Sequence, residues 1–218
     1  MVTANHVIWP RIADASLPLR KTIGLRLDSH ERSEGRSYDY TQIELDTSSW
    51  TEKRKDGVSV FLAAAVSGMI NGGYSSFVPS ADLWTRQDFE EGGFIGRGVV
   101  VAGYPDSILP DSSVPRPVIS SGAIASDPRW TAGVARNSGE HSVLYQGFSW
   151  SGMSGAPVMA EQVGLASSAS IQFSGHLARG VIGVSFGHVS STKSSHSSWS
   201  GLFPSWLILD ALSELTQG

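Results

Sequence analysis

Short runs of apolar residues recur along the whole chain, and in some of them, such as residues 22–27 and 41–45, hydrophobic and polar positions alternate. Each run is bounded by Gly, Pro, Asn, Asp or Ser. Runs of about four to nine residues with such boundaries predict β-strands, because successive side chains of a strand point to opposite faces of a sheet. The predicted strands cover residues 22–27, 41–45, 58–66, 98–102, 118–125, 142–145, 156–159, 171–174 and 179–186.

A single long segment, residues 205–215, has the periodicity of a helix. Its apolar residues, beginning with Trp206, recur three positions apart, and Pro204 stands directly before them. Many short strands followed by one helix favour an all-β barrel or sandwich over alternating β–α units.

The stretch between residues 63 and 93 combines paired glycines, Pro79 and a cluster of acidic residues, a composition typical of a connection between two β modules. The serine-rich residues 190–200 are predicted to form a long surface loop. The predicted organisation is an N-terminal unit at residues 1–75, a linker at 76–93, a second unit at 94–204 and a terminal helix at 205–216.

Composition narrows the class of protein. The 218 residues are enough to bury an apolar core, and 40% hydrophobic with 17% charged residues excludes a disordered chain. No apolar run reaches the roughly 18 residues that a membrane span needs, so no membrane segment is expected. The net charge of -4 argues against a nucleic-acid partner. The absence of cysteine excludes disulfides, thiolate nucleophiles and sulfur-ligated metals, and fits either a reducing compartment or a bacterial secreted protein without bridges.

The segment Gly152-Met153-Ser154-Gly155-Ala156-Pro157 carries the candidate chemistry. A serine between two glycines at a sharp bend exposes its hydroxyl and turns neighbouring backbone N–H groups toward one point. Ser154 is therefore a candidate nucleophile, with the N–H groups of Gly152 and Ser154 as candidate oxyanion donors. The alternative is an ordinary Ser/Gly hairpin turn. The segment is not the nucleophile elbow of α/β-hydrolases, because Ala156 stands where the second glycine belongs.

This segment resembles the Gly-x-Ser-Gly-x-Pro motif of the chymotrypsin-like, or trypsin-like, serine peptidases, in the form found in bacterial members. The resemblance implies a histidine and then an aspartate earlier in the chain. Residues 2–6, Val-Thr-Ala-Asn-His, resemble the family's strand ending in Thr-Ala-x-His, which implies that His6 is the general base.

The implied acid of the triad is Asp56, which precedes an alternating segment similar to the one that follows the family's aspartate. An alignment without gaps puts Gly57 at the aspartate position, so Asp56 fits only with a shift of one residue. Asp46 is the reserve candidate, and Asp39 is interpreted as a loop residue. The alternative for Asp56 is a solvated charge at the end of the charged run at residues 52–56.

Three further stretches extend the resemblance over most of the chain. Residues 99–105 with 116–126 resemble the opening strands of the family's second barrel, and residues 180–187 resemble the strand after the nucleophile. The third is the C-terminal helix. The end of the second stretch, Ser185, Phe186 and Gly187, would then bind an extended peptide by strand addition. Phe148 is the candidate for the side-chain pocket. Because residues 146–153 contain no acidic residue, we expect an apolar or small substrate side chain rather than Lys or Arg.

The resemblance implies two six-stranded antiparallel β-barrels, the N-terminal one incomplete, followed by the C-terminal helix. The implied function is that of a serine endopeptidase acting on peptide or protein substrates without a cofactor or metal. The second reading is a catalytically impaired protein of the same fold that binds peptides or has a structural role. The shifted aspartate favours it, as do the missing strands before His6, which lead us to expect either a natural start upstream of Met1 or a truncated relative. An unrelated β-sandwich that binds carbohydrate is the third reading.

The remaining histidines, His30, His141, His176, His188 and His196, are expected at the surface. His188 and His196 are eight residues apart in a serine-rich region without a nearby carboxylate, which argues against a metal site. The tryptophans are expected as core or loop anchors.

Overall fold

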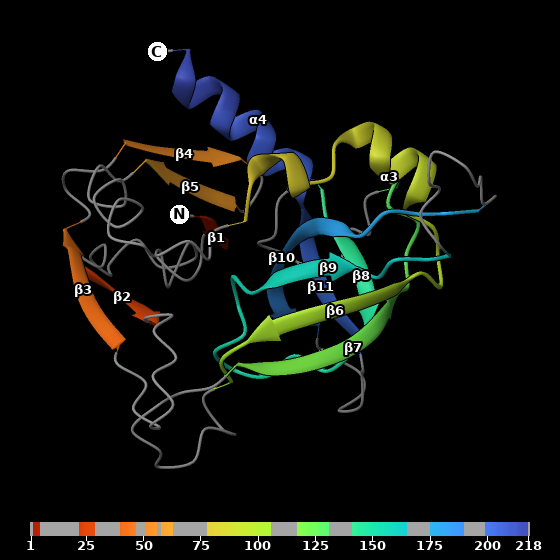
Figure 1. The fold of residues 1–218 in the computed structure, drawn as a ribbon, viewed down its shortest axis with the longest axis horizontal. Helices are drawn as coiled ribbons and strands as arrows, with labels where there is room; N and C mark the ends of the chain where they lie inside the picture. The colour runs from red at the N-terminus through yellow and green to blue at the C-terminus, as the bar shows by residue number, and fades with distance from the viewer. Residues whose placement is uncertain are drawn as a thin grey trace, which may run out of the picture.

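Figure 1 shows the fold of the chain in a computed structural model. The structure describes residues 2–4, 22–28, 40–46, 51–55, 58–62, 78–105, 117–130, 141–164, 175–189 and 199–217.

The C-terminal part is a closed barrel of six strands, each antiparallel to its neighbours, in the order β10-β11-β8-β7-β6-β9. Successive side chains of a strand point to opposite faces, so Val99 and Val101 of β6 are buried in the barrel core while Val100 between them is half-buried. The predicted six-stranded barrel is confirmed for this part of the chain (Figure 1). The strands are β6 (Gly98–Gly103), β7 (Val118–Ile124), β8 (Val143–Gln146), β9 (Pro157–Ala160), β10 (Gly180–His188) and β11 (Trp199–Pro204).

The described N-terminal strands form two open sheets. One has the order β1-β5-β4, and the other consists of β2 and β3. The predicted first barrel is therefore not seen among the strands that the structure describes. The five strands are β1 (Val2–Ala4), β2 (Thr22–Asp28), β3 (Tyr40–Asp46), β4 (Thr51–Lys55) and β5 (Val58–Leu62).

Residues 52–55 of the charged run belong to strand β4, which pairs in full with β5. Within the described sheet β4 is an edge strand, and charged side chains are tolerated at a sheet edge, where they discourage pairing with another chain.

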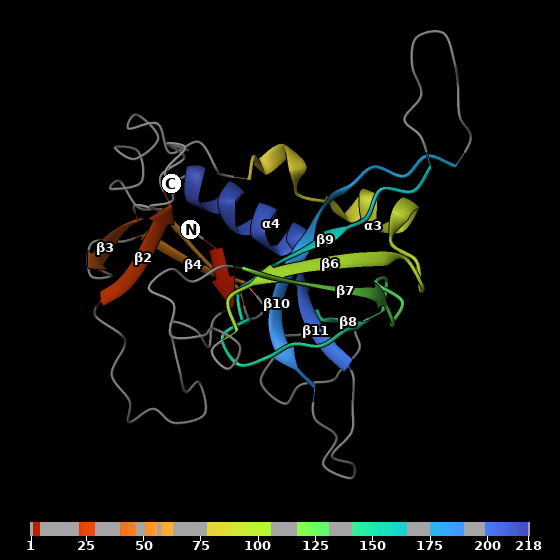
Figure 2. The ribbon, with the colours of Figure 1, turned by 60° about the horizontal axis from the view of Figure 1, so that its bottom comes forward.

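The predicted C-terminal helix is confirmed as α4 (Ser205–Thr216). It follows β11 without a loop and buries Trp206, Leu207 and Ile208, together with Ala211 and Leu215 farther along. The helix contacts β4 and β5 on one side and β10 and β11 on the other. Figure 2 shows α4 between the N-terminal strands and the barrel. Helix α4 therefore joins the two parts of the molecule in one apolar core.

The predicted linker at residues 76–93 contains a 3-10 turn, η2 (Ser80–Asp82), and a short helix, α3 (Arg86–Gly92). The side chain of Thr85 accepts a hydrogen bond from the Asp88 N–H, and the Asp88 carboxylate accepts one from the Thr85 N–H. This capping box satisfies N–H groups that the first turn of a helix leaves without partners. Phe89 then packs edge-on against Trp84, with ring centroids 5.5 Å apart.

None of the helices in the described ranges is long and apolar enough to cross a bilayer.

Candidate functional site

Ser154 lies on a pair of consecutive tight turns between β8 and β9. The Met153 N–H donates to the Trp150 carbonyl at 3.1 Å, and the Ala156 N–H donates to the Met153 carbonyl at 3.0 Å. Gly152 and Gly155 have φ angles of 91° and 88°, in the left-handed region that a side chain disfavours. Met153 is fully buried and anchors the loop, while Gly152 is exposed and Ser154 half-buried. The serine hydroxyl is thus held at the surface by a rigid turn, as the spacing of the glycines predicts.

Two backbone hydrogen bonds hold this turn against β10. The Gly155 N–H donates to the Ser185 carbonyl at 2.7 Å, and the Ser185 N–H donates to the Ala156 carbonyl at 2.8 Å. The Ser154 hydroxyl donates to the Phe186 carbonyl at 3.3 Å. The predicted nucleophile and the predicted peptide-binding strand are therefore neighbours, although 31 residues separate Ser154 from Ser185 in the sequence.

The backbone N–H groups of Gly152 and Ser154 are the predicted oxyanion donors. Among the described residues, neither N–H donates to a backbone carbonyl or to a side chain. An N–H group can stabilise the negative charge that develops on a substrate oxygen when no other acceptor already occupies it.

Gly187 keeps the space beside the serine open. Its φ of 108° is disfavoured for any residue with a side chain, and a Cβ at this position would lie 3.4 Å from the Ser154 hydroxyl oxygen.

Phe186 is the extra residue of a β-bulge between β10 and β11. Its ring packs against Phe203 at a centroid distance of 4.7 Å and occupies the space that Gly201 leaves by having no side chain. On the side facing β9, the described backbone hydrogen bonds of β10 end at Ser185. The main chain of residues 186–188 is left without a described strand partner on that side.

A buried hydroxyl pair lies beneath the bulge. The Tyr145 phenol is hydrogen-bonded to the Ser185 hydroxyl at 3.1 Å, and the Gly187 N–H donates to the same hydroxyl oxygen at 3.3 Å. Tyr145 and Ser185 are both 0% exposed. Burial raises the pKa of the Tyr145 phenol, more than its hydrogen bond with Ser185 lowers it, so the phenol stays protonated. Sequence reasoning missed Tyr145, whose only signal was a buried position in a predicted strand.

Tyr145→Phe is expected to lower the free energy of unfolding by about 1–2 kcal/mol, because the Ser185 hydroxyl loses one of its described partners inside the core. Urea unfolding followed by circular dichroism measures the difference. Tyr104→Phe is the matched control, since Tyr104 is 45% exposed and exposed substitutions usually change stability by less than about 0.5 kcal/mol. Equal stability losses in both variants would contradict the role given to the buried pair.

Phe148, the candidate for the substrate side chain, is 66% exposed and stacks on Trp150 with centroids 6.1 Å apart. Two hydroxyls from the barrel hold the backbone beneath it: the Ser120 hydroxyl donates to the Phe148 carbonyl at 3.2 Å, and the Ser200 hydroxyl donates to the Gly147 carbonyl at 2.8 Å. An apolar surface therefore lies in the loop that leads to Ser154.

His6 and Asp56 lie outside the described residues. The strands next to them are described: β1 ends at Ala4, β5 begins at Val58, and these two residues pair with each other. Strand β1 also contacts β10. The reserve candidate Asp46 is the last residue of β3 and pairs with Thr22.

Of the other histidines, His188 is exposed and His176 half-buried, while His30 and His196 lie outside the described residues. His141 is half-buried and packs against Trp206, with ring centroids 4.8 Å apart. Within the described ranges, no three His, Asp or Glu side chains are grouped so that they could hold a metal ion.

The chain matches no protein-family model, and no curated protein matches it at a significant level. Its activity is therefore inferred from its residues and their geometry.

Proposed function

We propose that the chain is a serine endopeptidase that hydrolyses peptide bonds through an acyl-enzyme formed on Ser154. The observation that carries the proposal is the Ser154 turn: a serine hydroxyl on a two-glycine bend, next to two N–H groups without a described acceptor and hydrogen-bonded to the strand end at Phe186. Such a grouping brings a nucleophile and an oxyanion site within reach of one carbonyl carbon.

In the proposed reaction the Ser154 oxygen attacks the substrate carbonyl while His6 removes the hydroxyl proton. The N–H groups of Gly152 and Ser154 stabilise the tetrahedral oxyanion, and the loss of one such donor typically costs about 2.7–4 kcal/mol. His6 then gives the proton to the leaving amine, and a water molecule hydrolyses the acyl-enzyme by the reverse sequence. Asp56 orients the imidazole and stabilises its cation.

Strand register supports the inclusion of His6 and Asp56. His6 follows the end of β1 by two residues and Asp56 precedes the start of β5 by two residues, at the end of the β1–β5 pair where Ala4 opposes Val58. Because β1 contacts β10, this pair belongs to the same side of the molecule as the strand that accepts the Ser154 hydrogen bond.

The substrate class follows from β10 and from the loop before Ser154. An extended peptide would add to the main chain of residues 186–188, which has no described strand partner on the side of β9. The stacked rings of Phe148 and Trp150 favour an apolar side chain near the scissile bond.

A fluorophosphonate probe tests the proposal, because it phosphonylates serines that are activated by a base. We expect one adduct per chain, located by peptide mapping at Ser154. The labelling rate is expected to fall about tenfold per pH unit below about pH 6, since an imidazole base is protonated there. A folded protein that stays unlabelled but binds peptides would support the non-catalytic reading, and a rate that is constant between pH 5 and 8 would exclude a histidine base.

A further inference from the structure

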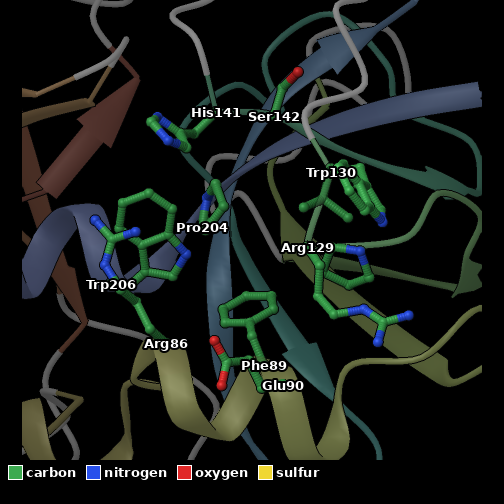
Figure 3. Close-up of a pocket in the computed structure, with 11 residues that line it drawn as sticks. Arg86, Phe89, Glu90, Arg129, Trp130, His141, Ser142, Pro204 and Trp206 are labelled. Atoms are coloured by element: carbon green, nitrogen blue, oxygen red, sulfur yellow. The ribbon is translucent and has the colours of Figure 1, made fainter.

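A pocket of about 220 Å³ lies between α3, the first turn of α4 and the turn at Asp127–Trp130 (Figure 3). Val143 and Pro204, the first residue of β8 and the last of β11, line it. The loop that carries Ser154 follows the other end of β8. The pocket therefore lies at the opposite end of this strand from the proposed active site.

The rings of Phe89, Trp130 and Trp206 and the imidazole of His141 line the pocket. Figure 3 shows Trp206 and Trp130 on opposite sides with Phe89 between them. Phe89 and Trp206 are buried, whereas Trp130 is 72% exposed at the rim. Tryptophan is enriched at interfaces, because its ring offers a large apolar surface and its N–H can still find a partner.

Both arginines that line the pocket are already paired. Arg86 donates to Asp210 at 3.1 Å, and its guanidinium carbon lies 3.4 Å from the centre of the Trp206 ring. Arg129 donates to both carboxylate oxygens of Asp127, at 2.9 and 2.6 Å. These hydrogen bonds lower the pKa of Asp127 to about 2, so its carboxylate is charged at neutral pH.

Glu90 is the lining carboxylate that has no hydrogen bond or ion pair with any of the described residues. In Figure 3 its carboxylate lies beside Phe89, on the side of Trp206. The negative charge of Glu90 also raises the pKa of Arg129, but less than the hydrogen bond with Asp127 and the charge of Asp127 do. With Arg86 and Arg129 each matched by an aspartate, Glu90 gives the pocket a net negative charge.

We propose that this pocket binds a basic side chain, the ammonium of a lysine or the guanidinium of an arginine, of a peptide or protein partner. The cation would lie against Glu90 and its carbon chain against Trp130 and Phe89. Aromatic faces attract an organic cation through their quadrupoles, and a carboxylate beside them attracts it through its charge. The chain already stacks one guanidinium in this way, that of Arg86 on Trp206. The volume suits one long side chain, and the exposed Trp130 at the rim favours one carried by a larger partner.

Titration of the full-length Ser154→Ala variant, which cannot cleave the ligand by the proposed reaction, tests the site. The ligands are the blocked pentapeptides Ac-Ala-Ala-X-Ala-Ala-amide with X as arginine, lysine, citrulline or glutamate, and free arginine amide. The readout is the NMR signals of the tryptophan indole N–H groups. We expect the arginine and lysine peptides to shift the Trp130 signal saturably, with an affinity at least tenfold above that of the citrulline peptide.

Glu90→Gln and Trp130→Ala are each expected to weaken binding of the arginine peptide by about tenfold or more. The matched control is Glu91→Gln, which removes the same charge from the same helix; Glu91 accepts a hydrogen bond from Gln87 and does not line the pocket. Thermal unfolding verifies that the variants stay folded. Equal affinity for the arginine and citrulline peptides, tighter binding of the glutamate peptide, or equal effects of Glu90→Gln and Glu91→Gln would overturn the proposal. Equal affinity for free arginine amide and the arginine peptide would overturn the choice of a peptide or protein partner.

Discussion

Replacement of Ser154 by alanine is expected to reduce kcat for peptide hydrolysis by about 10⁵- to 10⁶-fold, which is the size of the loss when the nucleophile of a triad is removed. The fold should persist. The hydroxyl makes one long hydrogen bond, 3.3 Å to the Phe186 carbonyl, at a half-buried position, so its removal is expected to cost less than about 1 kcal/mol of stability. Hydrolysis of a fluorogenic peptide with an apolar residue before the scissile bond measures the rate.

Ser151→Ala is the matched control for this prediction. Ser151 lies three residues earlier in the same loop and is exposed, so the control should retain the rate of the unmodified chain. If Ser154→Ala keeps its activity while Ser151→Ala loses it, the nucleophile has been assigned to the wrong serine. If neither variant changes a measurable rate, the hydrolysis arises elsewhere.

Arg97→Ala is expected to lower the free energy of unfolding by about 3–5 kcal/mol, because it leaves one buried and two part-buried carbonyls without their donor and opens a cavity. The side chain is 2% exposed, and its guanidinium donates to the carbonyls of Gly92, Glu161 and Ala178 at 2.8, 3.0 and 2.7 Å. It also lies 4.6 Å from the ring centre of Trp84. Burial lowers the pKa of Arg97, but an arginine keeps its charge in a protein.

Arg86→Ala is the control for Arg97, since Arg86, the first residue of α3, is exposed and forms an ion pair with Asp210 at the surface. Its loss is expected to cost about 1 kcal/mol or less. Urea unfolding measures both variants, and Arg97→Lys should fall between them because one ammonium cannot reach three separate carbonyls. A loss within about 1 kcal/mol for Arg97→Ala would show that the carbonyls find other donors.

Five of the six barrel strands and α4 were predictable, because short apolar runs between turn residues and apolar positions at helical spacing can be recognised in the sequence. Val99 and Val101 point into the barrel because a strand has a period of two, and the apolar face of α4 recurs at helical spacing. Helix α3 was missed because seven residues are too few for periodicity to be visible. Its one local signal was Thr85 followed three residues later by Asp88, and its stability depends on the packing of Phe89 on Trp84.

Strand β11 was missed for a different reason. Its first residues fall in the serine-rich segment, and it contains Gly201, so local propensity favours a loop there. Pairing on both edges, with β8 and with β10, nevertheless makes it a barrel strand. Gly201 is required because the Phe186 ring of the neighbouring strand occupies the place of a side chain.

The turn that presents Ser154 was predictable from local sequence, since two glycines at this spacing permit positive φ angles that other residues avoid. Contacts between distant segments were not predictable from local sequence. Closure of the barrel is needed for the hydrogen bond of Ser154 to β10 and for the burial of Tyr145 against Ser185. The docking of α3 and α4 is needed to place Glu90 in one pocket with Trp130 and Trp206. Local conformation follows from the residues of one segment, whereas a site assembled from several segments exists only once the apolar core has brought those segments together.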